Sequence, residues 1–470
     1  MKKTTLLFLL FVSLFTNFVF SQTKIDGNWT GLIKLPVMSM KMNITFSTTD
    51  TGISGTIQVP EQTNEIFNLS DIQFNTPSLK FTFKNSKDSK YDAFFDGIVY
   101  TDSILGSFKQ SIYKGTFILT PLTEDLTKNP KDSVKTELPY IEEEISFTNG
   151  DNYFSGTLTI PKSGTMHPAV IMITGSGAQN RNEDIMGFKI FGIIADYLTR
   201  RGIAVLRYDD RNFGKSKGTD VSMSTTADFA FDVIEAFKFL KNRKDIDGKK
   251  IGLFGHSEGG IVAPIVASIK KDVAFIVLMA GTSVRGCDII REQTKLILKS
   301  YNTSDTDINK TMSLQGRLID SVMSGGDLKA LREELIKDYI ENDNETPDSL
   351  KQKTAEDKAD AGIFQLTTPW IKYFLKLNPQ EYLEKITCPV LALFGGLDLQ
   401  VPVQQNEKPM KDALTKVGNK DFTIYTFSKA NHLFQTANTG SPAEYGTLEK
   451  KFTEGFLEYI GDWIVKRISN

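Results

Sequence analysis

The sequence predicts an α/β protein in which helices cover both faces of a mostly parallel sheet, with a small antiparallel β domain in front of it. Two patterns in the 470 residues lead to this prediction. Residues 24–120 contain short alternating strands with Gly, Asn and Asp turns and no helix pattern. In residues 140–470, buried strands alternate with amphipathic helices, as in parallel sheets with crossover helices.

The first domain is predicted to be an antiparallel sheet or small barrel of about 100 residues. Its expected strands are residues 41–48, 52–59, 79–84, 94–100 and 115–119. A polar segment at 124–135, with Pro130 inside it, predicts a linker. No charged or aromatic cluster marks a ligand site, so we expect a structural or oligomerising module rather than a binding module. The oligomeric state stays open.

The second domain is predicted from its buried strands and the helices between them. The expected strands are 144–148, 155–160, 169–174, 203–208, 250–254, 273–280, 389–394 and 422–427, and a closing helix is expected at 451–468. Between about 283 and 386 the strand pattern stops and the period becomes helical, which predicts a cap inserted over the pocket. The aromatic run Thr368 to Leu375 could line an acyl pocket, or it could pack the cap onto the core.

The first 21 residues are predicted to be a signal peptide. Lys2 and Lys3 precede an apolar run at 6–20, and Ser21 provides a small residue before the cleavage point. An uncleaved anchor is the alternative, but the run is shorter than the ~20 residues that span a bilayer. We therefore expect an exported protein, periplasmic or extracellular, without stable membrane insertion after cleavage.

Composition excludes several other classes of protein. The formal net charge of -2, without a basic cluster, argues against a nucleic-acid partner. Cys287 and Cys388 are the only cysteines, too few for a disulfide framework or a Cys-rich metal site, although one bridge between them remains possible. We expect no cofactor and no metal.

The strongest chemical signal is Ser257 within Gly255-His256-Ser257-Glu258-Gly259. A strand pattern at 250–254 precedes this motif and an apolar helix pattern at 260–267 follows it. A sharp strand-to-helix turn exposes the central serine as a nucleophile, and the flanking glycines allow the backbones to approach. A second match at 214–218 lacks this context, so Ser216 is interpreted as a loop serine.

A nucleophilic serine needs a histidine base and a carboxylate that orients it. Of the three histidines, His256 lies inside the turn and His167 precedes a strand, which leaves His432 just after the last expected strand. Asp398 follows the strand at 389–394 and is the candidate acid. The order Ser, Asp, His is the order of α/β-hydrolases. A surface histidine and a solvated turn aspartate are the alternatives.

The oxyanion formed during attack needs two N–H donors that are already in place. The backbone N–H of Glu258, directly after the nucleophile, is the first candidate. The second is expected from the turn Thr174-Gly175-Ser176-Gly177, with Ser176 preferred and Gly177 still possible.

Together these motifs resemble bacterial secreted α/β-hydrolase esterases of the EstD type, which are related to the serine aminopeptidase and dienelactone hydrolase groups. The resemblance covers roughly residue 140 to the C-terminus and includes Tyr208-Asp209-Asp210-Arg211. It implies an α/β-hydrolase fold and carboxylic ester hydrolysis by Ser257, Asp398 and His432. In two departures from the pattern, Asn212 stands where relatives often have Gly, and Thr174 where many hydrolases have His. Asp209, Asp210 and Arg211 are interpreted as a structural charge network.

The sequence thus favours a serine esterase that acts on small to medium acyl esters, with a small-molecule ester as its partner. A serine aminopeptidase-like enzyme is the alternative, because Glu183 and Asp184 could bind a free amino terminus. A non-catalytic exported binding protein is the third reading, and the complete triad argues against it.

Overall fold

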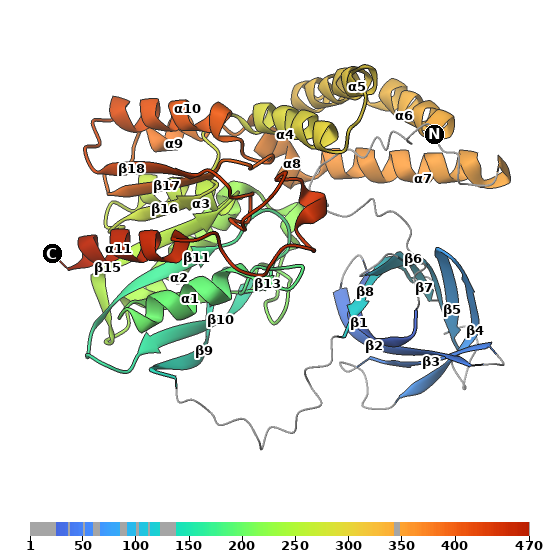
Figure 1. Cartoon of the computed structure of the whole chain (residues 1–470), viewed down its shortest axis with the longest axis horizontal. Helices are drawn as coiled ribbons and strands as arrows, with labels where there is room; N and C mark the ends of the chain where they lie inside the picture. The colour runs from blue at the N-terminus through green and yellow to red at the C-terminus, as the bar shows by residue number, and fades with distance from the viewer. Residues whose placement is uncertain are drawn as a thin grey trace. The chain divides into compact units, whose positions relative to one another are not determined.

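The computed structural model describes residues 25–35, 38–49, 52–59, 66–84, 92–99, 103–110, 113–122, 138–342 and 348–469. The chain forms two compact units, one within 15–136 and one that contains 137–470 (Figure 1). The predicted signal peptide and linker lie outside the described residues.

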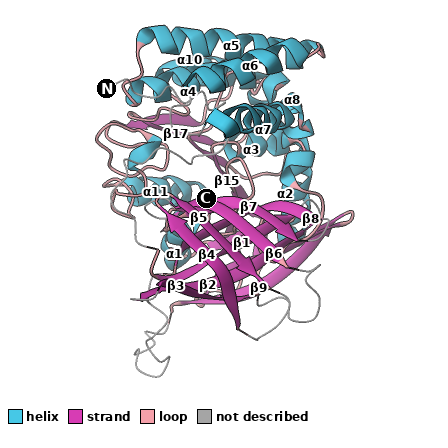
Figure 2. Cartoon of the chain, turned by 90° about the vertical axis from the view of Figure 1, so that its right-hand side faces the viewer, coloured by secondary structure: helices cyan, strands magenta, loops and turns pink. Residues whose placement is uncertain are grey.

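The first unit is a closed antiparallel barrel in which each strand pairs with its sequence neighbour and the first strand also pairs with the last (Figure 2). The predicted antiparallel β domain is confirmed, and of the two forms that the sequence left open, a sheet or a small barrel, it has the barrel. Its strands are β1 (Gly27–Leu35), β2 (Met38–Thr49), β3 (Gly52–Gln58), β4 (Phe67–Asn75), β5 (Ser78–Phe83), β6 (Ala93–Val99), β7 (Ile104–Gln110) and β8 (Tyr113–Pro121). Of these, β1, β4 and β7 were not predicted.

Aromatic rings fill the interior of the barrel. Phe81 stacks on Phe95 at 4.6 Å between ring centroids, and Phe117 meets both rings edge-on. Along β6, buried and exposed residues alternate strictly, as expected of a strand with one face on a core. The barrel therefore encloses a packed core of its own.

The second unit is built on an eight-stranded sheet in the order β18-β17-β16-β15-β11-β14-β10-β9. Neighbours from β18 to β14 run parallel, whereas β10 is antiparallel to both β14 and β9. The strands are β9 (Tyr140–Asn149), β10 (Asn152–Pro161), β11 (His167–Ile173), β14 (Ala204–Tyr208), β15 (Ile246–His256), β16 (Ile276–Met279), β17 (Val390–Gly395) and β18 (Phe422–Phe427). A short hairpin, β12 (Asp184–Ile185) and β13 (Phe188–Lys189), follows β11.

Two groups of helices pack on this sheet. The first group pairs α1 with α11, and in the second α2, α3, α9 and α10 follow one another across the sheet (Figure 1). Their bounds are α1 (Ile190–Arg200), α2 (Thr226–Lys241), α3 (Gly259–Ile269), α9 (Gln380–Leu383), α10 (Val403–Lys416) and α11 (Phe456–Ile468). This is the α/β-hydrolase fold that the sequence predicts.

The sequence of α2 explains where this helix begins and which of its faces is buried. The Thr225 side chain accepts the N–H of Asp228, and the Asp228 carboxylate accepts the N–H of Thr225, so both ends of a capping box are present. The apolar residues Ala230, Val233 and Phe237 then recur at helical spacing, and all three are buried.

Six helices of the described residues lie between β16 and β17, and the five that precede α9 form the cap. They are α4 (Gly286–Ser300), α5 (Asp305–Ser324), α6 (Lys329–Asn342), α7 (Asp348–Thr367) and α8 (Pro369–Lys376). Of the helices within the described ranges, none has both the length and the apolar character needed to cross a membrane.

Cys287 and Cys388 are both free thiols. Burial raises the pKa of Cys388 to about 12 and also raises the pKa of Cys287. Both groups therefore stay protonated at neutral pH, and protonated thiols are poor nucleophiles and poor metal ligands. In the part of the chain that the structure describes, no group of His, Cys, Asp and Glu is arranged to hold a metal ion.

Substitution of glycine by alanine should have opposite effects on stability at Gly252 and at Gly316. A Cβ at Gly252 in β15 would lie 2.3 Å from the buried ring of Phe275, whereas a Cβ at Gly316 in α5 would meet nothing within 4 Å. Gly252→Ala should therefore lower the free energy of unfolding by about 1–3 kcal/mol through overpacking. Gly316→Ala should raise it by about 0.5–1 kcal/mol, because alanine favours a helix interior. Urea denaturation of both variants tests the pair, and equal effects would contradict it.

Candidate active site

Ser257 lies in the turn between β15 and α3 and adopts φ +53°, in the left-handed region. Close backbone packing holds it there. A Cβ at Gly255 would lie 2.0 Å from the carbonyl oxygen of Gly259, and a Cβ at Gly259 would lie 2.1 Å from that of Ile173. The Ser257 N–H donates to the carbonyl of Met279 at 2.9 Å. Only glycines permit this turn, which is the strained nucleophile geometry expected from the motif.

Asp398 and His432 meet although they come from separate loops. Asp398 follows β17, His432 follows β18, and the Nδ1 of His432 lies 2.8 Å from the Oδ2 of Asp398. The other oxygen of Asp398 accepts the N–H groups of Gln400 and Val401 at 2.8 and 2.9 Å. The carboxylate is thus fixed, and it holds the imidazole with Nδ1–H toward Asp398 and Nε2 as the free acceptor.

One cavity joins the predicted site residues. Ser176, Ser257, Glu258 and His432 all line it, and it encloses about 890 Å³ of empty volume, part of it open to solvent. Asp398 lies behind His432 and is 3% exposed. The structure therefore places the candidate nucleophile, base and oxyanion donors around a common space, with the candidate acid in contact with the base.

The turn after β11 is held at both of its ends. The N–H of Gly175 donates to the Oε1 of Glu183 at 2.7 Å, and the N–H of Gln179 donates to the Oδ2 of Asp210 at 2.8 Å. These two N–H groups are already used, so an oxyanion donor has to come from the residues between them. Ser176 lines the cavity with Ser257, whereas Gly177 lines a different one. The geometry favours Ser176.

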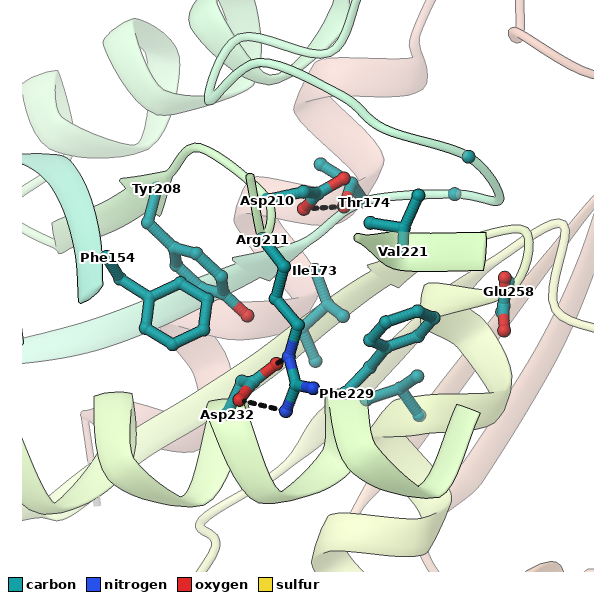
Figure 3. Close-up of a pocket in the computed structure, with 13 residues that line it drawn as sticks. Phe154, Ile173, Thr174, Tyr208, Asp210, Arg211, Val221, Phe229, Asp232 and Glu258 are labelled. Carbon is teal, nitrogen blue, oxygen red and sulfur yellow. Dashed lines mark hydrogen bonds and ion pairs between the residues drawn. The ribbon is translucent and has the colours of Figure 1, made fainter. Parts of the chain in front are cut away.

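Gly177 and Asp210 belong to a smaller cavity behind this turn (Figure 3). Within it the hydroxyl of Thr174 donates to Asp210 at 2.7 Å, so Asp210 binds both ends of the turn. Burial raises the pKa of Asp210 well above its usual range. In the same view Arg211 pairs with Asp232 on α2, at 2.6 Å.

Asp209 and Arg211 thus act as the structural charges that the sequence predicted. Asp209 pairs with Arg181 at 2.8 Å. Asn212 has φ +51°, a left-handed conformation that asparagine tolerates better than most residues, which explains how it replaces the glycine of relatives. The hydroxyl of Ser216 donates to the carbonyl of Asp209 at 2.7 Å, as suits a loop serine. The contribution of Asp210 to the turn was not predicted.

The side chain of Glu258 connects the cap to the nucleophile turn. Its carboxylate accepts the hydroxyl of Thr226 at 2.6 Å and the indole N–H of Trp370, on α8, at 3.0 Å. Burial raises the pKa of Glu258, although these donors and the hydroxyl of Ser176 oppose the rise. Trp370 stacks on Phe374, and both rings line the active-site cavity.

Sequence reasoning missed the partnership of Glu183 with His256. The Nδ1 of His256 lies 2.8 Å from the Oε1 of Glu183, and both residues are buried, at 2% and 0% exposure. The third histidine, His167, is buried at the start of β11 and does not line the cavity. The fixed position expected for His256 inside the turn hinted at a structural role, but nothing in the sequence named its partner.

Comparisons with known proteins identify the family of the chain and several proteins that resemble it. Residues 188–436, which include Ser257, Asp398 and His432, match the family model for serine aminopeptidase, S33. Esterase EstD of Thermotoga maritima is 30% identical over 72% of this chain and 72% of its own. An uncharacterized 31.7 kDa protein of Escherichia coli is 24% identical over 59% of this chain and 87% of its own. An esterase of Pyrococcus furiosus superposes with a TM-score of 0.45, at 16% identity, over 72% of this chain and 94% of its own.

The left-handed backbone of Ser257 predicts that the residue at this position changes the stability of the fold. Because glycine adopts φ +53° without a Cβ clash, Ser257→Gly should raise the free energy of unfolding by about 1 kcal/mol relative to Ser257→Ala. Both variants lack the hydroxyl, so the comparison isolates the backbone strain. Thermal unfolding measures it, and equal stabilities would show that the surrounding packing imposes no strain at this residue.

Proposed function

Because the chain belongs to the serine aminopeptidase S33 family of α/β-hydrolases and is a relative of esterase EstD, we propose that it is a serine carboxylic ester hydrolase. It acts through an acyl-enzyme on small to medium acyl esters. The observation that carries this proposal is the Asp398–His432 pair, at 2.8 Å, beside the strained Ser257 in one cavity.

In the first half of the reaction the hydroxyl of Ser257 attacks the ester carbonyl carbon, and Nε2 of His432 takes the hydroxyl proton. Asp398 stabilises the imidazolium that forms. The negative charge on the carbonyl oxygen is received by the N–H groups of Glu258 and Ser176, and the N-terminus of α3 adds its positive dipole end. The tetrahedral intermediate collapses, His432 returns the proton to the leaving alcohol, and the acyl group stays on Ser257.

In the second half a water molecule replaces the alcohol. His432 takes a proton from the water, which attacks the acyl carbon, and the acid product leaves as the proton returns to Ser257. All of these proton transfers use the same Nε2 atom, which the bond between Nδ1 and Asp398 keeps aimed at the cavity. The residues named here carry out both steps without a cofactor.

The lining of the cavity supports a neutral substrate with an apolar acyl group. Ile289, Ile290 and Ile297 from α4 face the cavity with Trp370 and Phe374 from α8. Of the described residues that line the cavity, none is Lys or Arg, and the ring of His256 is already paired with Glu183, so an anionic acyl group would find no unpaired positive charge there.

The peptidase alternative lacks an available amine site. Glu183 lines the cavity, but its side chain is fully buried. Its Oε1 already accepts from Gly175 and contacts His256, and its Oε2, which has no hydrogen-bond partner among the described residues, is buried as well. Asp184 does not line the cavity. A substrate ammonium group would have to displace this buried pair, so the geometry favours an ester over a peptide with a free amino terminus.

A substrate panel tests the proposal. The purified chain should hydrolyse p-nitrophenyl esters of two to eight acyl carbons, with little or no turnover of aminoacyl-anilides. Ser257→Ala should lower kcat by about 10⁴- to 10⁶-fold, because the nucleophile is removed. Ser216→Ala removes a hydroxyl from the other matching motif and should keep full activity. An organophosphonate should add covalently to Ser257, as read by mass spectrometry.

Preferred cleavage of anilides by the wild-type chain would support the peptidase instead. A wild-type chain that turns over neither substrate and forms no adduct would leave only a binding role.

We also propose that the chain is exported and loses residues 1–21. The charged start, the apolar run and Ser21 before the cleavage point support this proposal. N-terminal sequencing of protein from the periplasm or the medium should begin at Gln22. Recovery of the intact N-terminus in a membrane fraction would indicate an uncleaved anchor.

A further inference from the structure

A buried network centred on His256 connects three segments that are distant in sequence. The Nδ1 of His256 contacts the Oε1 of Glu183 at 2.8 Å, and its Nε2 contacts the backbone carbonyl oxygen of His432 at 3.1 Å. The same Oε1 accepts the N–H of Gly175 at 2.7 Å. The network therefore joins the oxyanion turn, the nucleophile turn and the loop of the catalytic base.

The partners of His256 determine its charge. A backbone carbonyl only accepts hydrogen bonds, and so does an ionised carboxylate. Both ring nitrogens of His256 face such acceptors, and only the doubly protonated imidazolium donates to both. Burial disfavours the charged ring, but the negative charge and hydrogen bond of Glu183 outweigh it, and the pKa of His256 is raised. The other titratable groups near the ring are His432 and Asp398.

The conformation and burial of Glu183 are energetically unfavourable. Its backbone φ is +46°, its side chain is fully buried, and among the described residues its Oε2 has no hydrogen-bond partner. A left-handed backbone is strained for a non-glycine residue, and a buried carboxylate oxygen without a donor adds to the unfavourable energy. Strain and desolvation of this kind are retained where a precise position serves function.

We propose that Glu183 and His256 form a permanently ionised positioning pair that sets the oxyanion turn and the His432 loop relative to Ser257. This inference rests on the proposed esterase function. Neither residue touches the reacting atoms. Glu183 uses Oε1 to occupy the N–H of Gly175, which leaves the N–H of Ser176 as the donor. His256 holds the main chain of His432 while Asp398 holds its ring.

The charge of His256 can be read in the wild-type protein without any substitution. In the full chain labelled with ¹⁵N-histidine, His256 should show two ring N–H protons at pH 8, where an ordinary histidine with a pKa of about 6.5 is neutral. The chain has only three histidines, so variants at His167 and His256 assign the signals. A single ring N–H on His256 at pH 8 would overturn the ionised pair.

Kinetics test the positioning role. Glu183→Gln and His256→Gln keep side-chain size approximately but remove the ion pair, and each should lower kcat about 10- to 100-fold, while KM changes less than about 3-fold. Phenylboronic acid, which forms a tetrahedral adduct on serine, should bind these variants more weakly by a similar factor. Glu143→Gln is the matched control, because Glu143 lies on β9, is half-exposed and forms an ion pair with Arg243. It should change neither value.

The outcomes separate this inference from the proposed function. If Glu183→Gln and His256→Gln lose thermal stability but keep kcat and boronate affinity, the pair is structural only and the positioning role is wrong. A wild-type chain that hydrolyses no ester, yet shows the imidazolium, would contradict the proposed function alone. If either variant fails to fold, the ¹⁵N experiment on the wild-type chain still decides the charge of the pair, and the boronate comparison proceeds with the other variant.

Discussion

The close approach of β15 and α3, without side chains between them, is the constraint on which the site depends. Ser257 keeps its left-handed φ because Gly255 and Gly259 let two backbones pass where any Cβ would clash. Gly260 extends this contact toward β16, since its Cβ would lie 2.5 Å from the Cα of Gly281. The packing fixes the serine, the N–H of Glu258 and the N-terminal dipole of α3 as one rigid group.

The order of the parallel strands brings the remaining groups to this turn. β15, β16, β17 and β18 are neighbours, and parallel strands end at one edge of a sheet. Asp398 and His432 follow β17 and β18, so their loops meet beside Ser257 although a cap of five helices interrupts the chain between β16 and β17. Because the insertion lies at that edge, α4 and α8 of the cap line the pocket while β16 and β17 remain paired.

The candidate nucleophile, acid and base could be predicted because each has a local signal next to a buried strand. The polar network behind them could not. Glu183, His256 and Asp210 acquire their roles only when the sheet brings separate loops together, and the sequence around each residue fits an ordinary turn or charge cluster.

In the barrel, β1 and β7 were missed because Gly31 and Gly106 suggest turns. In the structure both glycines instead allow close strand contact, since a Cβ would lie 1.8 Å from the carbonyl oxygen of Ile118 and 2.2 Å from that of Asp96, respectively. β4 was missed at a register shift between Ser70 and Gln73, which breaks its alternation.

The residue after the nucleophile connects the chemistry to the cap. In the proposed mechanism the backbone N–H of Glu258 donates to the oxyanion, and in the structure its carboxylate accepts the indole N–H of Trp370 on α8. A buried carboxylate is costly without donors, and this one has donors from α2 and from the cap, in Thr226 and Trp370. Displacement of α8 would leave the carboxylate short of a donor directly beside the oxyanion site. The position of the cap and the geometry of the nucleophile turn are therefore parts of one hydrogen-bonded unit, and the same contact fixes the apolar wall that we propose for the acyl group.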